Sequence, residues 1–243
     1  MFPIGGTPLG LSDLTVIHTG HNAKDVKNVL FGVSRILTRR WMVAVDGSRT
    51  FENGYLTEPY KVISLMDSIS GAPVGQLTDK RPTSRQRSSL MFSSVYHLTD
   101  DVLYSSYRYY RDTWNVRSHT IDLKYRHELG VDTILEGSTY VEPLLRYYHQ
   151  TAASFYTVGL VRGAPLPDFA TSDYRLGQLQ TITLGATFGF RPDDSTADWT
   201  VRAQYMHQTG NGSPPNAVGI QRTFDLVPPV NSYAIVIGYS FDY

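Results

Sequence analysis

The amino-acid sequence predicts an all-β protein, a transmembrane antiparallel up-and-down β-barrel of about 10–12 strands. Apolar and polar residues alternate with a period of two over much of the chain, and only an extended strand separates such residues onto two faces. The alternating segments are roughly 9–13 residues long, close to the ~9–11 residues that a tilted strand needs to cross a bilayer. Helical periodicity is almost absent, and no apolar run approaches the roughly 18 residues of a membrane-spanning helix.

The expected strands share this alternation, or a run of β-branched and aromatic residues, and turn residues separate them. They are residues 29–37, 41–48, 85–98, 102–112, 119–129, 143–150, 152–160, 180–190, 198–208 and 231–243. The clearest is the last one, NSYAIVIGYSFDY, in which every second side chain is large and apolar or aromatic. Residues 60–69 are the one segment left undecided between helix and strand.

Two kinds of connection separate the expected strands. Short turn signals rich in Asp, Gly and Pro occur at residues 99–101, 129–132 and 191–195. Long irregular segments rich in Gly and Pro occupy residues 50–84, 161–177 and 210–230. Short turns at one end and long loops at the other are typical of outer-membrane barrels.

The chain is expected to form one domain over residues 1–243, because no repeat of fixed period and no linker divides it. The N-terminus, MFPIGGTPLGLSDL, has no basic region followed by an apolar stretch, so no signal peptide is visible. This start is compatible with a chain that lacks its signal peptide and N-terminal strands.

The composition of the two strand faces favours a membrane barrel over a soluble sandwich or barrel, which is the alternative fold. In a soluble sandwich the polar face meets water and often carries lysine and glutamate. Here the polar face carries Gly, Ser, Thr, Ala, Gln and Arg, as an enclosed lumen would. The candidate lumen-lining residues are Arg108, Asp122, Lys124, Arg126, Arg146, Arg202 and Gln204. The candidate lipid-facing residues are Ile182, Leu184, Phe188, Phe190, Trp199, Val201, Tyr205, Tyr233, Ile235, Ile237, Tyr239 and Phe241.

The end of the chain carries a candidate assembly signal. Gly238, Phe241 and Tyr243 form a G-x-x-F-x-Y ending on an amphipathic strand. This pattern resembles the C-terminal signal that the outer-membrane barrel assembly machinery recognises, so that machinery is an expected partner.

Composition excludes several classes of function. The chain has 22 basic and 22 acidic residues, whereas nucleic-acid binding needs a clustered basic excess, so nucleic acid is not expected as a partner. It has no cysteine, which removes disulfides, thiolate metal sites and cysteine nucleophiles. No phosphate loop, dinucleotide fingerprint or EF-hand pattern appears, and no cofactor is expected.

Four longer motifs together resemble a family of uncharacterised bacterial outer-membrane β-barrel proteins, a domain of unknown function. They are GYLTEPYK at residues 54–61, RPTSRQR at 81–87, YRYYRDTW at 107–114 followed by His119-Thr120, and RYYHQTAASFY at 146–156. The resemblance runs from about residue 25 to the C-terminus. It implies the barrel fold and a location in the bacterial outer membrane, with lipids of that membrane as partners, but no settled activity.

Two groups of charged and aromatic residues have a functional and a structural interpretation. Tyr107, Arg108, Tyr109 and Arg111, with Arg146, Tyr147 and Tyr148 two strands later, could form a lumenal ladder that binds anionic or aromatic solutes. The favoured alternative is that Arg108, Arg146, Asp112 and Glu142 neutralise one another. The RPTSRQR motif with Lys80 could bind anionic headgroups. The favoured alternative is an interface anchor whose long side chains reach toward water.

Histidine and serine residues give only weak catalytic or metal-binding patterns. No histidine pair has metal-site spacing; His18 and His21 are merely close in sequence. Ser154 and His149 are candidates for a hydrolase pair only by proximity, and no G-x-S-x-G elbow exists. The sequence therefore predicts no metal site and no enzyme.

The favoured function is a passive channel, or a role in solute passage or export across the outer membrane. The alternative is a scaffold or adhesion barrel with a side-chain-filled lumen, functional long loops and an unidentified envelope partner. A barrel of about ten strands is narrow enough for side chains to nearly fill, so both remain open.

Overall fold

The computed structural model describes residues 23–58, 60–132, 137–193, 197–212 and 217–241. These residues are almost entirely β-structure with two short 3-10 helices. In chain order the elements are β1 (Lys24–Thr38), β2 (Trp41–Gly54), β3 (Val62–Met66), β4 (Pro73–Thr78), β5 (Ser84–His97), β6 (Val102–Asp112), β7 (Arg117–Asp132), β8 (Gly137–Gln150), β9 (Leu160–Val161), η1 (Tyr174–Leu176), β10 (Leu179–Pro192), β11 (Ala197–Gly210), η2 (Gly219–Thr223) and β12 (Val230–Phe241).

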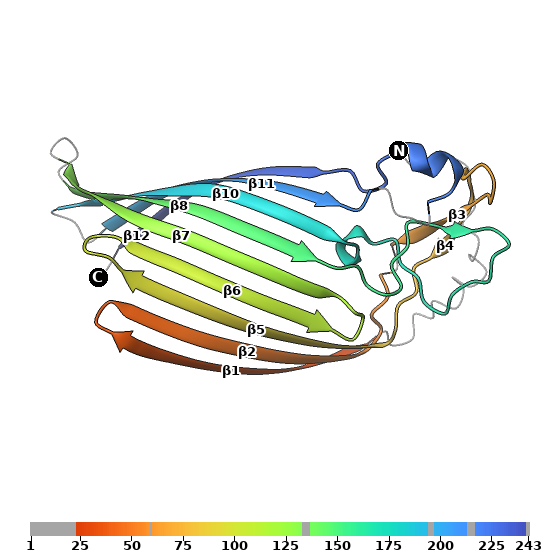
Figure 1. The fold of residues 1–243 in the computed structure, drawn as a ribbon, viewed down its shortest axis with the longest axis horizontal. Helices are drawn as coiled ribbons and strands as arrows, with labels where there is room; N and C mark the ends of the chain where they lie inside the picture. Colours follow the sequence, from red (N-terminus) through yellow and green to blue (C-terminus); the bar gives the residue numbers. More distant parts are fainter. Residues whose placement is uncertain (1–22, 59, 133–136, 194–196, 213–216, 242–243) are drawn as a thin grey trace.

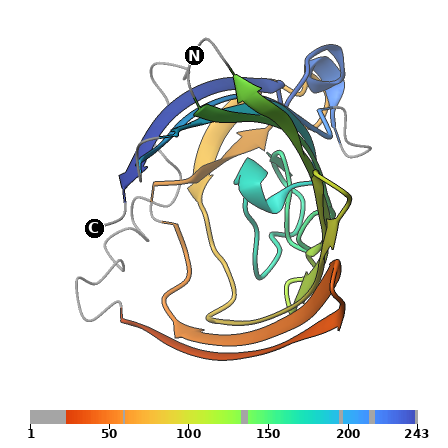
Figure 2. The same cartoon turned by 90° about the vertical axis from the view of Figure 1, so that its left-hand side faces the viewer.

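Nine long strands form one antiparallel sheet in the order β1-β2-β5-β6-β7-β8-β10-β11-β12. Each strand pairs with the next long strand along the chain, so the topology is up-and-down. The sheet curls through most of a cylinder (Figure 2). Among the described residues, β1 and β12 each pair on one side only, and the curl is therefore open between them.

The connections alternate between the two ends of the sheet (Figure 1). The end that carries the short β1–β2 and β5–β6 connections, residues 39–40 and 98–101, is called the turn end below. The opposite end, called the loop end, carries residues 55–83, 151–178 and 211–229. The long irregular segments expected from the sequence therefore gather at one end, as predicted.

A second, small sheet lies at the loop end. It contains β3, β4 and the two-residue β9 in the order β4-β3-β9, with β3 and β9 parallel. Viewed along the cylinder, β3 and β4 and parts of the segment 151–178 lie inside the curl (Figure 2). The β2–β5 connection and the segment 151–178 therefore cover the loop end of the cylinder, whereas η2 lies outside the curl (Figure 2).

The all-β, antiparallel, up-and-down fold class is confirmed, and nine of the expected strands match the nine strands of the large sheet. The expected strand at residues 152–160 is wrong. This segment is irregular up to β9, because its apolar side chains pack into a cluster at the loop end; Ala153 is 4 % exposed there.

The turn expected at residues 129–132 is also wrong. These residues continue β7, and the pairing of β7 with β8 shifts register between Glu128 and Gly130. Gly130 has a φ of 87°, a conformation that glycine adopts without steric cost, so the glycine forms a bulge inside the strand rather than a turn.

The two faces of the large sheet differ in the way predicted for a barrel. In β10, Thr181 and Thr187 are buried, whereas Ile182, Leu184 and Phe188 are 41 %, 52 % and 42 % exposed. A soluble sheet would bury the apolar set and expose the threonines. The face that carries Thr181 is the concave one and is called the inner face; the other is the outer face.

Small residues on the inner face leave room for larger inner side chains. A Cβ at Gly189 would lie 2.0 Å from the ring of Tyr140, so the glycine is needed for this ring to lie against the sheet. The guanidinium of Arg126 in turn lies 3.7 Å from the centre of the Tyr140 ring, a cation–π contact.

The buried apolar core is small and lies at the loop end rather than along the sheet. Trp114, Val116, Ala153 and Leu176 form it, with Phe155 packed edge-on against Trp114 at 5.2 Å between ring centres. This cluster joins the β6–β7 turn to the segment 151–178. Of the described helices, none is long and apolar enough to cross a membrane.

Candidate functional site

The candidate site is a polar cavity of about 380 Å³ between the inner face and the inward-folded loops. Its walls come from inner-face residues of five strands, β2 and β5 to β8, and from the loop around η1. Inner-face hydroxyl groups are frequent in the lining, and four arginines contribute to it. The arginines are Arg85, Arg87, Arg108 and Arg175.

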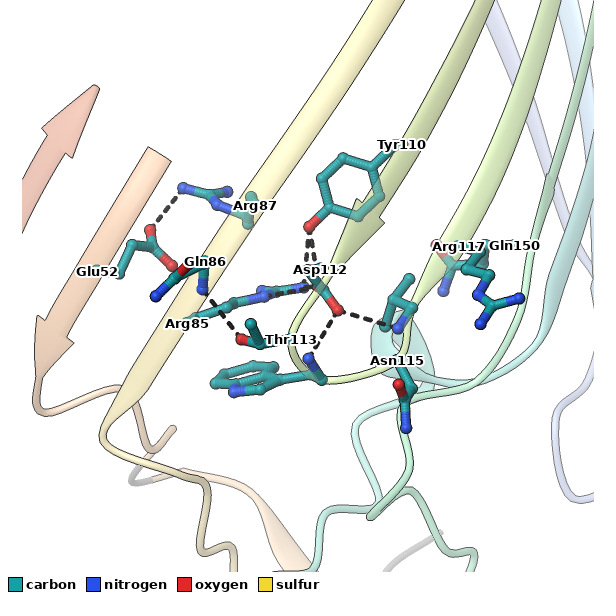
Figure 3. Close-up of polar contacts among 12 residues, drawn as sticks. Glu52, Arg85, Gln86, Arg87, Tyr110, Asp112, Thr113, Asn115, Arg117 and Gln150 are labelled. Atoms are coloured by element: carbon teal, nitrogen blue, oxygen red, sulfur yellow. Dashed lines mark hydrogen bonds and ion pairs between the residues drawn. The ribbon is translucent and has the colours of Figure 1, made fainter. Parts of the chain in front are cut away.

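Asp112 fixes the first of these arginines. Its Oδ2 accepts hydrogen bonds from Arg85 Nε at 2.9 Å and from the Tyr110 hydroxyl at 2.9 Å (Figure 3). Its Oδ1 accepts from the backbone N–H groups of Trp114 and Val116 at 2.9 and 3.0 Å. The fully buried carboxylate of Asp112 therefore neutralises Arg85 and closes the β6–β7 turn.

Glu52 neutralises the second arginine. Its carboxylate, 4 % exposed, accepts from Arg87 Nη2 at 2.5 Å and from Lys24 Nζ at 2.8 Å. The buried Nε of Arg87 has no hydrogen-bond partner among the described residues. Glu52 thus joins three neighbouring strands, β1, β2 and β5, on the inner face. Figure 3 shows its contact with Arg87.

Arg108 gives the cavity its excess positive charge. It lies on the inner face in the same cross-strand row as Thr120 and Tyr148, and it forms no ion pair within the described part of the chain. Farther toward the turn end the inner-face charges pair: Arg146 with Asp122 at 2.5 Å and Arg126 with Glu128 at 2.5 Å. Within the cavity, cations therefore outnumber the carboxylates paired with them.

An ionic cluster, in which Asp79 and Asp173 are buried, the Arg81 side chain is 9 % exposed and Arg175 is exposed, holds the loops over this cavity. Arg81 Nη2 lies 2.7 Å from Asp79 Oδ2 and 3.0 Å from Asp173 Oδ2. Arg175 binds the same Asp173 through Nε and Nη2, at 2.9 and 2.6 Å. Because Asp79 and Arg81 follow β4 and Asp173 precedes η1, the cluster ties the two inward-folded segments together. We call these four residues the loop clamp.

The two carboxylates of the loop clamp respond to burial in opposite directions. Burial raises the pKa of Asp79 above its ordinary value, and the attraction of Arg81 does not offset this effect. Burial also acts to raise the pKa of Asp173, but the side-chain and backbone hydrogen bonds from Arg175 outweigh it, and the pKa lies below its ordinary value. Asp173 is therefore the carboxylate that the clamp stabilises in its charged form.

A glutamine connects the clamp loop to the large sheet. Gln150, at the loop end of β8, donates from Nε2 to the carbonyls of Arg175 and Gly177 at 2.9 and 2.6 Å. Its Oε1 accepts from the Tyr148 hydroxyl. The η1 loop is thus attached to the wall of the cavity by the neutral side chain of Gln150 and to the segment after β4 by the charged loop clamp.

All seven candidate lumen-lining residues lie on the inner face. Besides Arg108, Asp122, Arg126 and Arg146, the set includes Lys124, which faces Glu142 at 3.9 Å, and Arg202, whose Nε donates to Thr187 Oγ1 at 3.0 Å. Gln204 pairs with Gly185 in the register of β10 and β11. The structural interpretation holds only in general form: Arg146, Asp112 and Glu142 are paired, but with Asp122, Arg85 and Lys124 rather than with one another. Arg108 and Arg202 form no ion pair within the described residues.

The tyrosine–arginine ladder does not form as one group. Strand alternation places Arg108, Arg146 and Tyr148 on the inner face, but Tyr107, Tyr109, Arg111 and Tyr147 on the outer face. On the outer face the Tyr107 hydroxyl lies 2.7 Å from His119 Nδ1. Adjacent residues of a strand point to opposite faces, so the ladder is corrected to an inner and an outer half.

Neither interpretation of the RPTSRQR motif is correct for its three arginines. Arg81, Arg85 and Arg87 point inward and pair with Asp173, Asp112 and Glu52. The exposed Lys80 lies over the Phe169 ring at 5.9 Å. The motif alternates Arg-x-Arg along β5, and this period of two, with Glu52 and Asp112 on the neighbouring strands, is the sequence signal that indicates an inner ion-pair row.

The candidate lipid-facing residues lie on the outer face of β10, β11 and β12. Phe190 and Tyr205 are half-buried, and the other ten are exposed, for example Ile235 at 76 % and Phe241 at 49 %. Aromatic residues gather near the turn end; Trp199 and Tyr239 lie 4.5 Å apart between ring centres. Gly238 and Phe241 of the candidate assembly signal belong to β12, and Tyr243 lies outside the described residues.

The structure does not bring the residues of the weak catalytic pattern together. His149 lies on the outer face of β8, whereas Ser154 lies in the inward-folded segment, where its N–H donates to the Trp114 carbonyl. His18 and His21 lie outside the described residues. Asp173 and Gln150, which complete the candidate site, were not singled out from the sequence: Asp173 belongs to none of the quoted motifs, and Gln150 lies within RYYHQTAASFY, a motif that indicates the family and not a site.

Taken together, the inverted faces and the polar inner cavity are those of an up-and-down antiparallel β-barrel of the outer-membrane type, whose sheet is open between β1 and β12 among the described residues. The chain belongs to the family described as protein of unknown function (DUF3570), whose model matches residues 13–241. This confirms the resemblance to an uncharacterised barrel family. No curated protein matches the chain.

Two solved structures of OmpT from Vibrio cholerae are similar to this chain: the outer-membrane-expressed protein and the in-vitro folded trimer form. Both are 10 % identical to it with a TM-score of 0.48. The alignments cover 90 % and 89 % of this chain, and 56 % and 54 % of the OmpT chains. The chain thus spans about half the length of the solved structures that it matches.

Proposed function

We propose that this protein lies in the bacterial outer membrane and forms a narrow polar passage for small hydrophilic solutes, constricted at the loop end. The observation that carries the membrane location is the inversion of the two faces. Outer-face Ile, Leu, Phe and Val side chains of β10 to β12 are exposed, while threonines on the inner face are buried. Exposed apolar surface on this scale is costly in water and favourable in hydrocarbon.

The polar inner wall supports passage of solutes rather than a solid interior. The cavity next to the η1 loop is lined mainly by hydroxyl, amide and guanidinium groups, which exchange hydrogen bonds readily with water and polar solutes. Its excess charge, at Arg108, favours anions over cations of similar size. The loop clamp sets the width at this end, because it fixes both inward-folded segments.

A scaffold barrel with a filled lumen is the second candidate, and the ion pairs favour it. Most inner-face charges are neutralised in pairs, and the apolar cluster around Trp114 packs solidly at the loop end. In that case the long loops carry the activity through an envelope partner. The two candidates differ in one measurable property, which is conductance.

Planar bilayer recordings separate the two candidates. We expect the purified protein to give small, discrete conductance steps, and Asp173→Ala to give larger ones, because the substitution releases the clamp. Asp101→Asn is the matched control: it removes one carboxylate at the turn end, where Asp101 binds Tyr125 and His127 on the outer side. Asp101→Asn should conduct like the wild type. No steps from either the wild type or Asp173→Ala, in protein that resists protease, would overturn the channel and support the scaffold.

A further inference from the structure

Three arginines form a row on the outer face at the loop end. Arg49 of β2, Arg111 of β6 and Arg117 of β7 occupy one cross-strand row: Arg111 pairs directly with Arg117, and both Arg49 and Arg111 pair with Ser88 of the strand between them. All three are exposed. We call this group the outer arginine row.

The row has no carboxylate partner of its own. None of the three arginines forms an ion pair within the described residues; Arg49 donates to the Gln86 amide oxygen at 3.1 Å and lies over the Phe51 ring at 5.3 Å. Asp112 is near, but Arg85, Tyr110 and two backbone N–H groups already occupy its carboxylate. Like charges directly opposite in a sheet repel, so the Arg111–Arg117 pair costs stability unless an anion lies between them.

The row faces a cavity that suits such an anion. This cavity, about 460 Å³ in volume, lies on the opposite side of the sheet wall from the inner one and is lined by the three arginines, by Asp112 and by five other potential donors. Those donors are Gln86, Ser88, Tyr109, Thr113 and Asn115. Guanidinium groups fork onto phosphate oxygens, and neighbouring hydroxyl and amide groups satisfy the remaining lone pairs.

The position of the row relative to the apolar surface identifies the source of the anion. The next outer-face row toward the turn end contains Leu90, Tyr109, His119 and His149, and the one after it contains Phe92, Tyr107, Ile121 and Tyr147. Successive rows on one face lie ~7 Å apart. The arginines therefore lie one row farther from the apolar band than the row of aromatic and histidine residues that borders it. In a membrane barrel this position corresponds to the depth of the lipid headgroups.

We infer that the outer arginine row binds the phosphate groups of phosphorylated lipid headgroups in the leaflet at the loop end. This inference rests on the proposed membrane location. A phosphate between Arg111 and Arg117 relieves their repulsion, and Arg49, one strand further along the row, reaches a second phosphate or the far side of the same one. A lipid site at this height fixes the depth of β2, β5, β6 and β7 in the bilayer.

The test counts lipids that remain bound to the full chain in a neutral detergent, by native mass spectrometry. The probes are phosphatidylglycerol, phosphatidylcholine and an uncharged digalactosyl lipid without phosphate. We expect retention in that order, and a loss of at least about tenfold in phosphatidylglycerol binding in the triple variant R49Q/R111Q/R117Q, given the contribution of each cation at a membrane surface. The single variants Arg111→Gln and Arg117→Gln should each lose part of the binding.

Arg35→Gln is the matched control. Arg35 is an exposed arginine on the outer face of β1 near the turn end, and it forms no ion pair within the described residues. This variant should retain phosphatidylglycerol like the wild type. An equal loss in Arg35→Gln, or equal retention of all three lipids by the wild type, would overturn the lipid site.

A competition experiment with inorganic phosphate distinguishes a site for free phosphate from a site for a lipid headgroup. Inorganic phosphate at about 100 mM, far above a ~1 mM affinity typical of weak ion sites, should reduce lipid retention only slightly, because acyl chains on the apolar band add to the binding. Complete displacement would identify a free-phosphate site and overturn the lipid assignment. Protease resistance of each variant in vesicles is measured in parallel; a wild type that does not insert would overturn the proposed function as well.

Discussion

At the scale of single residues, the site is governed by which carboxylate meets which arginine. Arg81 lies between Asp79 and Asp173, yet the two carboxylates are not equivalent. Asp173 accepts hydrogen bonds from Arg175 as well, whereas Asp79 Oδ1 has no hydrogen-bond partner among the described residues. A buried charge is stabilising only when its hydrogen bonds compensate for lost hydration, so the loop clamp depends on Asp173.

Substitution of the two carboxylates by asparagine should therefore have unequal effects. Asp173→Asn removes the charge that holds both Arg81 and Arg175 and should destabilise the loops by about 3–5 kcal/mol. Asp79→Asn keeps the side-chain volume and leaves Arg81 paired with Asp173, so a change within about 1 kcal/mol is expected. Urea-induced release of the loops, followed by the fluorescence of Trp114, measures both. Equal destabilisation by the two variants would contradict this ranking.

The stability of the folded loops is expected to decrease at acidic pH. Because the pKa of Asp173 lies below its ordinary value of 3.8, its contribution to stability is present above that value and is lost as the pH falls through the lowered pKa. Asp79, whose pKa is raised, takes up its proton earlier, and this protonation favours the folded loops. Protease resistance of the loops should thus persist from neutral pH to about pH 4 and fall below it. A loss already at pH 6 would contradict the assignment.

At the scale of strands, alternation is a strong predictor and local motifs are weak ones. The period of two in the last strand and in β10 and β11 predicted their positions and their faces, because one side of each strand must be apolar. Gly-rich and Pro-rich stretches predicted the three long loops for a similar local reason. The strand predicted at residues 152–160 is wrong because the apolar side chains that suggested it pack against Trp114 instead. Trp114 lies 38 positions before residue 152, so no local pattern reveals this contact.

The candidate site was only partly predictable for a physical reason. Strand periodicity shows that Arg85 and Arg87 share a face, but it does not show which carboxylates lie opposite. Glu52 reaches Arg87 only through the β2–β5 register, and Asp173 reaches Arg81 only because a loop folds inward. Contacts between loops that are far apart in the chain leave no periodic pattern in a single sequence. The loop clamp could therefore not be predicted from the sequence.

The face assignment of β10 can be tested with one pair of neighbouring residues. Ile182, on the outer face, and Thr183, on the inner face, lie at the same depth, so lysine substitutions of the two differ only in the side of the sheet. Ile182→Lys should destabilise the inserted protein by about 2–4 kcal/mol if the site is near the bilayer midplane, and by less near an interface. Thr183→Lys should cost little, because its ammonium group reaches the polar interior. Urea unfolding in vesicles measures both; a larger effect at Thr183 would reverse the two faces.

At the scale of the whole molecule, the two ends of the sheet differ in the length of their connections and in the residues that they carry. The turn end has short connections and outer-face aromatic residues such as Trp41 and Tyr96, whose rings pack edge-on at 6.4 Å. The loop end carries the small sheet, the loop clamp and the outer arginine row. In outer-membrane barrels the short turns face the periplasm and the long loops face outward. If this chain follows that rule, the proposed constriction and the proposed lipid site belong to the same, outward side of the membrane.

This orientation is testable in cells because the sequence contains no cysteine to give background labelling. Ile69, in the connection between β3 and β4, is 87 % exposed at the loop end, and Asp100 is exposed in the β5–β6 connection at the turn end. A membrane-impermeant maleimide should label Ile69→Cys in intact cells, whereas Asp100→Cys should react only after the outer membrane is permeabilised. The reverse pattern would place the loops in the periplasm, and the outer arginine row would then face the inner leaflet, where its partner would be a phospholipid of that leaflet.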